Sequence, residues 1–465
     1  MLVLLSDLHL TDESTSNNVH PDVFKEILKN EILQNAEENK AKEIRIALLG
    51  DILDFVRTDY WFRKKIEMGK RPWGGIIDPE TGMNNDFKTI EKQFNKILDD
   101  ILNTRSCRAL FKILNDVANQ SGIYTKVTYV IGNHDRVLWN FDSLQNKIRN
   151  SLSKVTFKNE DPKRIEFLQV LYAPEYGVLG RHGHEWDKVC HGYEFYNKVL
   201  NKNNKVGRFD LKTYKVMALG EVVTAELMAG LIYNIKSSPI FKNENIFIRE
   251  LKDLNNVRPM IDVFRWLEWI MAEKELSLEF KNVIYNSLKK SVESLLSSSL
   301  AKKWDDMTVD TIFTGDLVDR LQLLNHILAS SNYEKIKNAI MKLFSLVEIF
   351  KGKEDNYTKG AEEERKWMDS SDVRDIQYIV YGHTHVAKHD YFSGKVDGKV
   401  RMYINTGTYL PLIERTKNNK EFADSFQMTM AFFYRKDEDR SGRGRNPSGP
   451  TMELWNGIKR KKYIH

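Results

Sequence analysis

The clearest pattern in the sequence is a short apolar run that ends in residues able to bind a metal ion. Runs of this length that stop at glycine or a polar residue are typical of buried strands. The runs and their endings are residues 1–6 before Asp7-Leu8-His9, 44–49 before Gly50-Asp51-Ile52-Leu53-Asp54, 127–131 before Gly132-Asn133-His134-Asp135, 176–181 before His182-Gly183-His184, and 376–381 before Gly382-His383-Thr384-His385. Because open α/β sheets bind ligands at the carboxyl ends of their strands, these endings predict one shared site.

Apolar residues at helical spacing occupy much of the remaining chain. They predict a long helix at 87–117 and further helices between His182 and His383, for example at 280–295 and 336–347. That segment separates the two histidine motifs by 201 positions. The pattern predicts an α/β core interrupted by a helical insertion with its own apolar core.

Two charged segments carry no apolar pattern. Residues 351–365 are rich in Lys and Glu and predict a mobile connection back to the core. Residues 440–450 interleave arginine with glycine, which favours a solvated hairpin loop, although such arginines could also bind a phosphate backbone.

Composition limits the class of protein. The chain has 465 residues, 29% of them charged and 41% hydrophobic, which is typical of a globular protein with more than one domain. We predict no membrane span, and the net charge of +6 permits an anionic substrate without requiring nucleic acid. Met1 begins the first apolar run directly, and Cys107 and Cys190 are too few for a disulfide framework, so we expect a cytoplasmic protein.

Each strand ending has an ordinary structural explanation when taken alone. Asp51 could cap a helix or form an Asx turn, and a single histidine is more often a core residue than a ligand. The joint occurrence of all the motifs makes these explanations poor. Imidazole and carboxylate together suit Mn, Fe, Zn or Co, whereas Ca and Mg usually take oxygen ligands alone.

In this order, the motifs resemble those of the calcineurin-like metallophosphoesterases. The resemblance covers roughly the first 190 residues and the last 95. It implies a four-layer α/β/β/α sandwich, formed by residues 1–190 and 371–465, with an all-helical cap inserted at 191–370. This segment is called the insertion below, and it would limit substrate size, recognise a protein partner or form an oligomer.

The resemblance also implies two divalent metal ions, with Mn favoured and Fe, Zn or Co as alternatives. Asp51 would bridge them, and a shared hydroxide would attack phosphorus in line. The implied ligands are Asp7, His9, Asp51 and His385 for one ion, and Asp51, Asn133, His182 and His383 for the other.

His134 is implied to be catalytic rather than a ligand, protonating the leaving oxygen or stabilising its charge. We expect Asp135 to orient His134, and Asp54 to support a ligand, with a helix cap as the alternative for Asp54. His182 is favoured over His184 as the ligand because it matches the family's His-Gly element. His184 would then contact the substrate or orient its neighbour.

A long aromatic and basic loop follows Asp54, and loops at strand ends commonly recognise substrates. The candidate substrate contacts in this loop are Tyr60, Trp61, Arg63, Arg71 and Trp73, with a packed surface loop as the alternative.

The sequence therefore predicts a phosphoric ester hydrolase, with a phosphodiester or nucleotide pyrophosphate favoured over a monoester. A DNA or RNA nuclease is an alternative that would need a continuous basic groove. A metal-bound scaffold that recruits a partner through the insertion is a third reading, and it is weakened because none of the expected ligands is missing.

Overall fold

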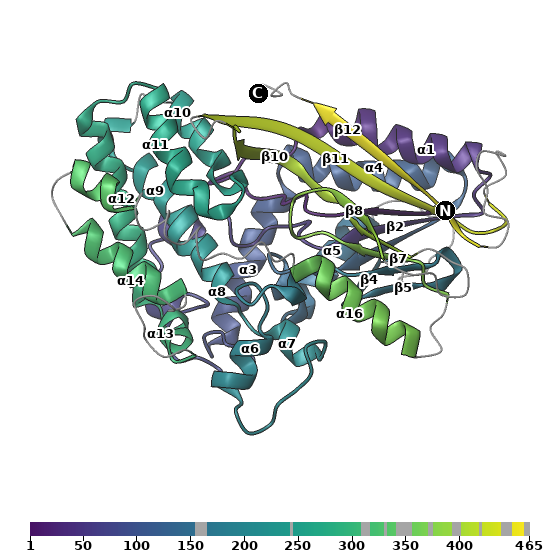
Figure 1. Cartoon of the computed structure of the whole chain (residues 1–465), viewed down its shortest axis with the longest axis horizontal. Coiled ribbons are helices and arrows are strands. Elements are labelled where there is room, and N and C mark those ends of the chain that lie inside the picture. The colour runs from purple at the N-terminus through teal and green to yellow at the C-terminus, as the bar shows by residue number, and fades with distance from the viewer. Residues whose placement is uncertain are drawn as a thin grey trace.

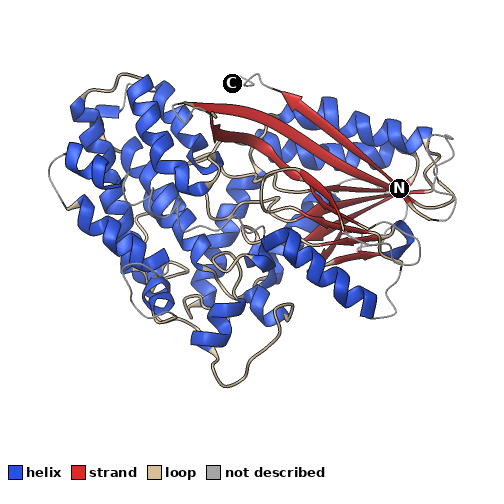
Figure 2. Ribbon diagram, in the orientation of Figure 1, coloured by secondary structure: helices blue, strands red, loops and turns tan. Residues whose placement is uncertain are grey.

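The computed structural model describes residues 1–153, 165–241, 245–307, 317–329, 333–340, 356–370, 375–392, 401–417, 421–438 and 449–459. The strands gather on one side of the molecule and a large group of helices on the other (Figures 1 and 2). All five strands predicted from the apolar runs are present, and the chain is confirmed as mixed α/β with two mixed sheets.

The first sheet has the strand order β10-β11-β1-β2-β3-β4, with β12 also paired to β11. Its strands are β1 (Leu2–Leu5), β2 (Glu43–Leu49), β3 (Tyr124–Val130), β4 (Ile165–Leu168), β10 (Gly407–Arg415), β11 (Phe422–Tyr434) and β12 (Thr451–Lys459). Strands β1 to β4 pair in parallel, so the residues that follow β1, β2 and β3 meet at one edge.

The second sheet has the strand order β5-β6-β7-β9-β8. Its strands are β5 (Leu171–Ala173), β6 (Val178–Gly180), β7 (Tyr378–Tyr381), β8 (Lys388–Tyr391) and β9 (Met402–Asn405). β6 and β7 are parallel neighbours, with Gly180 opposite Val380. This pairing brings together the two histidine motifs that the insertion separates in sequence.

The two sheets share one apolar cluster. Leu4, Leu49 and Val130 of the first sheet belong to the same buried cluster as Val178 and Val380 of the second. Residues that alternate with them, such as Val3 and Ile46, join a larger cluster with the helices, because successive side chains of a strand point to opposite faces. A third cluster joins Ile379 and Tyr403 to Ala361 of a late helix.

The helices of the described chain fall into two sets. Those before the insertion are α1 (Lys29–Glu38), α2 (Tyr60–Arg63), α3 (Phe87–Leu102), α4 (Arg105–Ser121) and α5 (Asp142–Ser153). Those after His182 are α6 (Tyr193–Phe195), α7 (Leu211–Lys215), α8 (Leu219–Val222), α9 (Gly230–Lys236), α10 (Asn245–Leu251), α11 (Val263–Glu273), α12 (Leu278–Ser297), α13 (Ser299–Asp305), α14 (Leu317–Leu328) and α16 (Asn356–Ser370). Figure 1 shows α9 to α14 grouped at the left of the molecule, where the ends of β10 and β11 reach them.

The single helix predicted at 87–117 is wrong, because α3 ends at Leu102 and α4 begins at Arg105. Thr104 lies between them in an extended conformation, and its hydroxyl accepts a hydrogen bond from the Cys107 amide. A threonine at this position caps the second helix, a local signal that the continuous apolar stripe obscured.

The mobile connection predicted at 351–365 is also wrong over its described part. Residues from Asn356 onward form α16, which buries Ala361 against the second sheet and pairs Glu364 with Arg181 at 3.0 Å. Residues 351–355, the arginine-rich stretch 440–445 and much of the predicted helix at 336–347 lie outside the described residues.

One helical stretch, Leu211–Lys236, has the length and apolar character of a membrane span, with a mean hydropathy of 1.5. However, 78% of its most apolar window is buried inside the protein, as in a core helix. The described residues therefore give no indication of a membrane span, as the sequence predicted.

Candidate metal centre

The backbone after the strands adopts a rare conformation at the expected ligands. Residues other than glycine seldom have a positive φ, which costs roughly 1–2 kcal/mol for each residue and tends to occur at functional sites. Here the strained positions include Asp7 (53°), His9 (42°), Asp51 (53°), His383 (69°) and His385 (64°). Backbone hydrogen bonds from Asp7 to Gly50 (3.1 Å) and from His9 to Asp51 (2.8 Å) hold the first two motifs together.

Two positions in these motifs require glycine, because a neighbouring carboxylate approaches the backbone too closely for a side chain. A Cβ at Gly132 would lie 2.3 Å from Oδ1 of Asp51, and one at Gly382 would lie 2.4 Å from Oδ2 of Asp7. Both distances are far shorter than any real contact of a Cβ atom. The glycines therefore let neighbouring strand ends approach the two carboxylates.

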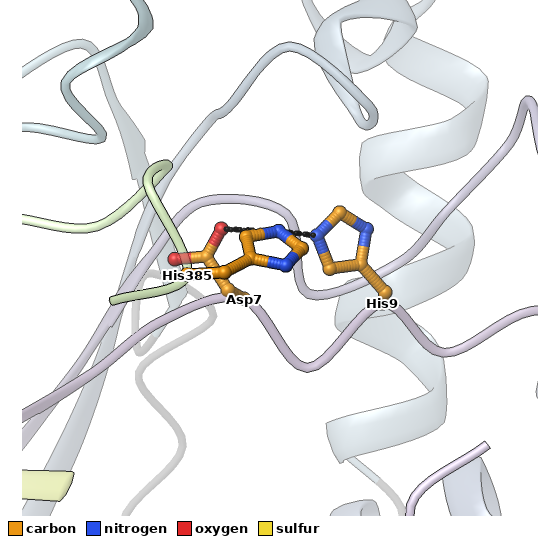
Figure 3. A group of neighbouring side chains, drawn as sticks. All are labelled: Asp7, His9 and His385. Carbon is orange, nitrogen blue, oxygen red and sulfur yellow. Dashed lines mark hydrogen bonds and ion pairs between the residues drawn. The ribbon is translucent and has the colours of Figure 1, made fainter. Parts of the chain in front are cut away.

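The first group of candidate ligands comprises Asp7, His9 and His385 (Figure 3). Nε2 of His9 lies 2.9 Å from Nε2 of His385, and Oδ1 of Asp7 lies 3.7 Å and 3.5 Å from these two nitrogens. All three residues are buried. The sequence places His385 376 positions after His9, so the fold alone unites them.

The second group of candidate ligands comprises Asp51, His182 and His383. Nε2 of His182 lies 3.2 Å from Oδ2 of Asp51 and 3.1 Å from Oδ1 of Asn133. Nδ1 of His182 contacts the Leu49 carbonyl at 2.8 Å, which fixes the ring. The rings of His182 and His383 are 5.2 Å apart between centroids.

Asp51 connects the two groups. Its Oδ2 lies 3.7 Å from Nε2 of His9, while its Oδ1 accepts a hydrogen bond from the His134 amide at 2.8 Å. Burial opposes ionisation of this carboxylate, but the nearby rings of His182 and His134 outweigh burial and hold the pKa of Asp51 well below its usual range. An ionised carboxylate between two histidine sets is the geometry expected of a bridging ligand.

The donor atoms fit a metal ion. Two ligands that each lie about 2.1 Å from one ion are about 3.0–3.4 Å apart, close to the separations in both groups. Oδ1 of Asp7 is buried and has no hydrogen-bond partner among the described residues. A buried carboxylate oxygen without a partner is costly, and a cation would remove that cost.

Asp54 supports the first group and His134 together. Its Oδ2 lies 2.9 Å from Nδ1 of His9, 2.9 Å from Nδ1 of His134 and 3.1 Å from Nε of Arg57. Its Oδ1 accepts hydrogen bonds from the amides of Val56 and Arg57, both at 3.0 Å. Asp54 therefore contacts a ring of the first group and also holds its own turn, and it caps no helix, since α2 begins only at Tyr60. Its support of a metal ligand stays a prediction.

The predicted role of Asp135 is not what the structure contains. Asp135 is fully buried and accepts hydrogen bonds from the Tyr129 hydroxyl (2.6 Å) and from the amides of Ile52 (3.0 Å) and Gly132 (2.5 Å). These contacts support the turn that carries Asp51. Asp54, rather than Asp135, contacts the ring of His134.

His184 lies behind the candidate ligands rather than beside Asp51. Its ring centroid is 5.3 Å from that of His182 and 5.2 Å from that of His191. Burial lowers the pKa of His184 well below its usual range and that of His191 to about 4, so both rings are neutral near pH 7. Neither nitrogen of His191 has a hydrogen-bond partner within the described chain.

Three residues at the centre were missed by the sequence analysis. Oδ2 of Asp187 lies 3.5 Å from Nε2 of His383, and the Tyr357 hydroxyl of α16 donates to the same oxygen at 3.3 Å. Nη2 of Arg258, in the insertion, lies 2.8 Å from Nδ1 of His385. A carboxylate three positions after His184 was a visible signal for Asp187, whereas no local pattern marks Tyr357 or Arg258.

Comparison with protein-family models and with curated proteins found no match for this chain. The buried groups of histidine and aspartate could hold metal ions, which supports the predicted cofactor class without identifying the metal.

Most of the candidate side chains in the loop after Asp54 are buried. Trp61 and Trp73 are fully buried with ring centroids 5.2 Å apart, and Tyr60 is 8% exposed. Arg71 and Trp73 both donate to Glu226 of the insertion, at 2.5 Å and 2.7 Å. Packing against the insertion thus accounts for these side chains, as in the packed-loop alternative.

Arg63 is the most exposed of the candidate substrate contacts. Its side chain is 47% exposed and pairs with Asp59 at 3.0 Å and with Asp100 at 3.6 Å. Within the described part of the chain, no hydrogen bond or ion pair joins it to either ligand group, so its role in substrate binding stays a prediction.

Proposed function

We propose that this protein is a metal-dependent phosphoric ester hydrolase of the calcineurin-like type. The observation that carries the proposal is Asp51, a buried carboxylate within 3.2 Å of a ring nitrogen of the second group and 3.7 Å of one in the first. In this proposal the two sheets and the flanking helices are the four-layer sandwich, and the insertion is its cap. The proposed cofactors are two divalent ions, with Mn favoured.

Bound ions of this kind supply positive charge to phosphate oxygens and make water a better nucleophile near neutral pH. The protein's contribution is to hold the donor atoms rigidly. Asp54 fixes the ring of His9, the Leu49 carbonyl fixes that of His182, and Asp187 contacts that of His383. Such supporting contacts typically change metal affinity by about 10- to 100-fold when removed.

His134 is the proposed general acid. Its Nδ1 lies 2.9 Å from the Asp54 carboxylate, and its side chain is 13% exposed, more than that of each histidine and aspartate among the proposed ligands. Burial alone would lower the pKa of His134, but Asp54 and Asp51 outweigh burial and raise it. A raised pKa keeps a proton available near neutral pH for the leaving oxygen, a contribution typically worth about 10² to 10⁴ in rate.

The proposed substrate is a phosphodiester or a nucleotide pyrophosphate. The test is hydrolysis of bis-p-nitrophenyl phosphate and of p-nitrophenyl phosphate with added Mn²⁺, by wild type, Asp51→Asn and His134→Ala. We expect diester turnover that Asp51→Asn abolishes, and that His134→Ala reduces by about 10² or more without changing metal content. Asp22→Asn, at an exposed carboxylate, is the matched control and should behave as wild type.

Each alternative result has a distinct meaning. Monoester turnover alone would replace the diesterase with a phosphatase. No turnover by protein that holds two ions would contradict the hydrolase and favour the scaffold, in which the insertion recruits a protein partner. A cytoplasmic location stays a prediction.

A further inference from the structure

Arg258 connects the insertion to the first ligand group. Its amide donates to the Ile413 carbonyl of β10 at 2.8 Å, and its Nη1 donates to the carbonyls of Asn255 (3.0 Å) and Val257 (2.9 Å). These bonds fix one side of the guanidinium. The other side, Nη2, lies 2.8 Å from Nδ1 of His385.

The protons along this contact can be assigned from chemistry. A guanidinium only donates, so Nδ1 of His385 accepts and a neutral ring carries its proton on Nε2. That nitrogen lies 2.9 Å from Nε2 of His9, whose Nδ1 donates to the Asp54 carboxylate at 2.9 Å. The result is a continuous series of donors and acceptors from Arg258 through His385 and His9 to Asp54.

Metal ligation by His385 is incompatible with this contact. If His385 binds an ion through Nε2, its ring proton moves to Nδ1 and faces a group that cannot accept it. If it binds through Nδ1, the lone pair used by Arg258 is no longer free. Either way, Arg258 and a metal ion compete for His385.

A second guanidinium lies nearby. Arg57 is 3% exposed, its charge repels that of Arg258, and its Nη1 has no hydrogen-bond partner among the residues that the structure describes. Arg57 pairs with Asp54 through Nε at 3.1 Å, which leaves its Nη1 to bind an anion, and the N–H groups of a guanidinium match the oxygens of a phosphate.

We propose that Arg258 is a phosphate-binding residue supplied by the insertion, and that metal binding releases it from His385 so that it contacts the phosphoryl oxygens of the substrate. This inference rests on the proposed function and deepens it. The insertion would then take part in substrate binding directly, in addition to limiting access. Arg57 binds the same oxygens from the core.

The test is calorimetric titration of wild type, Arg258→Ala and Arg258→Lys, first with Mn²⁺ and then with inorganic phosphate. Arg249→Ala, at an exposed arginine of α10, is the matched control. In the Mn-loaded protein we expect Arg258→Ala to weaken phosphate binding by about 10- to 100-fold, and Arg258→Lys to weaken it less. Mn²⁺ binding should be tighter in Arg258→Ala, because a competing donor is gone.

Phosphate binding and Mn²⁺ binding should change in opposite directions in Arg258→Ala. This result would distinguish a phosphate-binding role of Arg258 from a structural role. A loss of both Mn²⁺ and phosphate affinity in Arg258→Ala would overturn the proposal and assign Arg258 a structural role. Equal phosphate affinity in wild type and Arg258→Ala would also overturn it, and if wild type still hydrolyses the diester, the proposed function stands. Failure of wild type both to bind phosphate and to hydrolyse either ester would overturn the proposed function itself.

Discussion

The two ligand groups of the candidate centre are supported by different parts of the protein. In the first group, His385 is 5% exposed and lies between His9 and Arg258 of the insertion. In the second group, the side chain of His383 is 10% exposed and contacts Asp187, which Tyr357 of α16 also contacts. Each group therefore has a supporting carboxylate, Asp54 at His9 and Asp187 at His383, but only the first also has a guanidinium against a ligand ring, and the second is more open to solvent.

This difference implies unequal metal sites. A carboxylate beside a ligating imidazole strengthens the ligand, whereas a guanidinium that competes for the imidazole weakens metal binding. We therefore expect the second group to bind Mn²⁺ more tightly, and the first to fill at higher Mn²⁺ concentration. Stepwise titration would measure the two affinities.

The largest effect should come from Asp51, which both groups share. Asp51→Asn is expected to reduce diester turnover by at least about 10³-fold, since it removes several kcal/mol of charge stabilisation, and to weaken both metal sites. Asp7→Asn should weaken the first site alone. Metal content after dialysis would measure both changes, and equal losses in the two variants would contradict a bridging role for Asp51.

Substitution of the two supporting carboxylates, Asp54 and Asp187, should have a smaller effect, and each substitution should weaken one metal site. Asp54→Asn is expected to lower the Mn²⁺ affinity of the first group by about 10- to 100-fold, and Asp187→Asn to do the same for the second. Each variant should leave the other site near its wild-type affinity. If either substitution weakened both sites equally, the two groups would not be independently supported.

His191, whose ring packs against that of His184, allows a test of how the stability of the protein depends on pH. Its pKa is lowered by burial to about 4, so between about pH 4 and 6.5 the unfolded chain binds more protons than the folded one. Stability therefore falls as pH drops through that range, by about 2 kcal/mol between pH 7 and pH 5 for this residue. His191→Phe should remove that loss and leave stability at pH 7 unchanged or higher.

Urea unfolding of the two proteins at pH 5 and pH 7 would measure this difference. His389→Phe, at an exposed histidine, should keep the wild-type pH dependence. A loss of stability at pH 7 in His191→Phe would mean that the ring makes an essential polar contact.

The smallest effect is expected at Arg63, which belongs to neither ligand group and supports neither of them. The side chain of Arg63 is 47% exposed, so solvent screens its ion pairs, and Arg63→Ala should change the free energy of unfolding by less than about 1 kcal/mol. We also expect kcat/KM to stay within about twofold of wild type. A rise in KM with unchanged metal affinity would instead support the substrate contact predicted from the sequence.

The convergence of the candidate ligands was predictable because their signal is local. Each motif follows an apolar run, and parallel pairing of β1, β2 and β3 aligns their ends, so Asp7, Asp51 and Asn133 had to meet. The helix break at Thr104 and the roles of Asp54 and Asp135 were harder, because they depend on side-chain direction within a turn. Arg258 was out of reach, since its partner His385 is 127 positions away and nothing in its neighbours marks it.

The pairing of β6 with β7 also has a consequence for synthesis on the ribosome. Asp7, Asp51 and Asn133 leave the ribosome early, but His383 and His385 follow the whole insertion, hundreds of residues later. At about 5–20 residues per second, an incomplete ligand set waits for tens of seconds before its last members emerge. The candidate centre is therefore completed late, and metal ions that bind the full ligand set would stabilise only chains translated beyond His385.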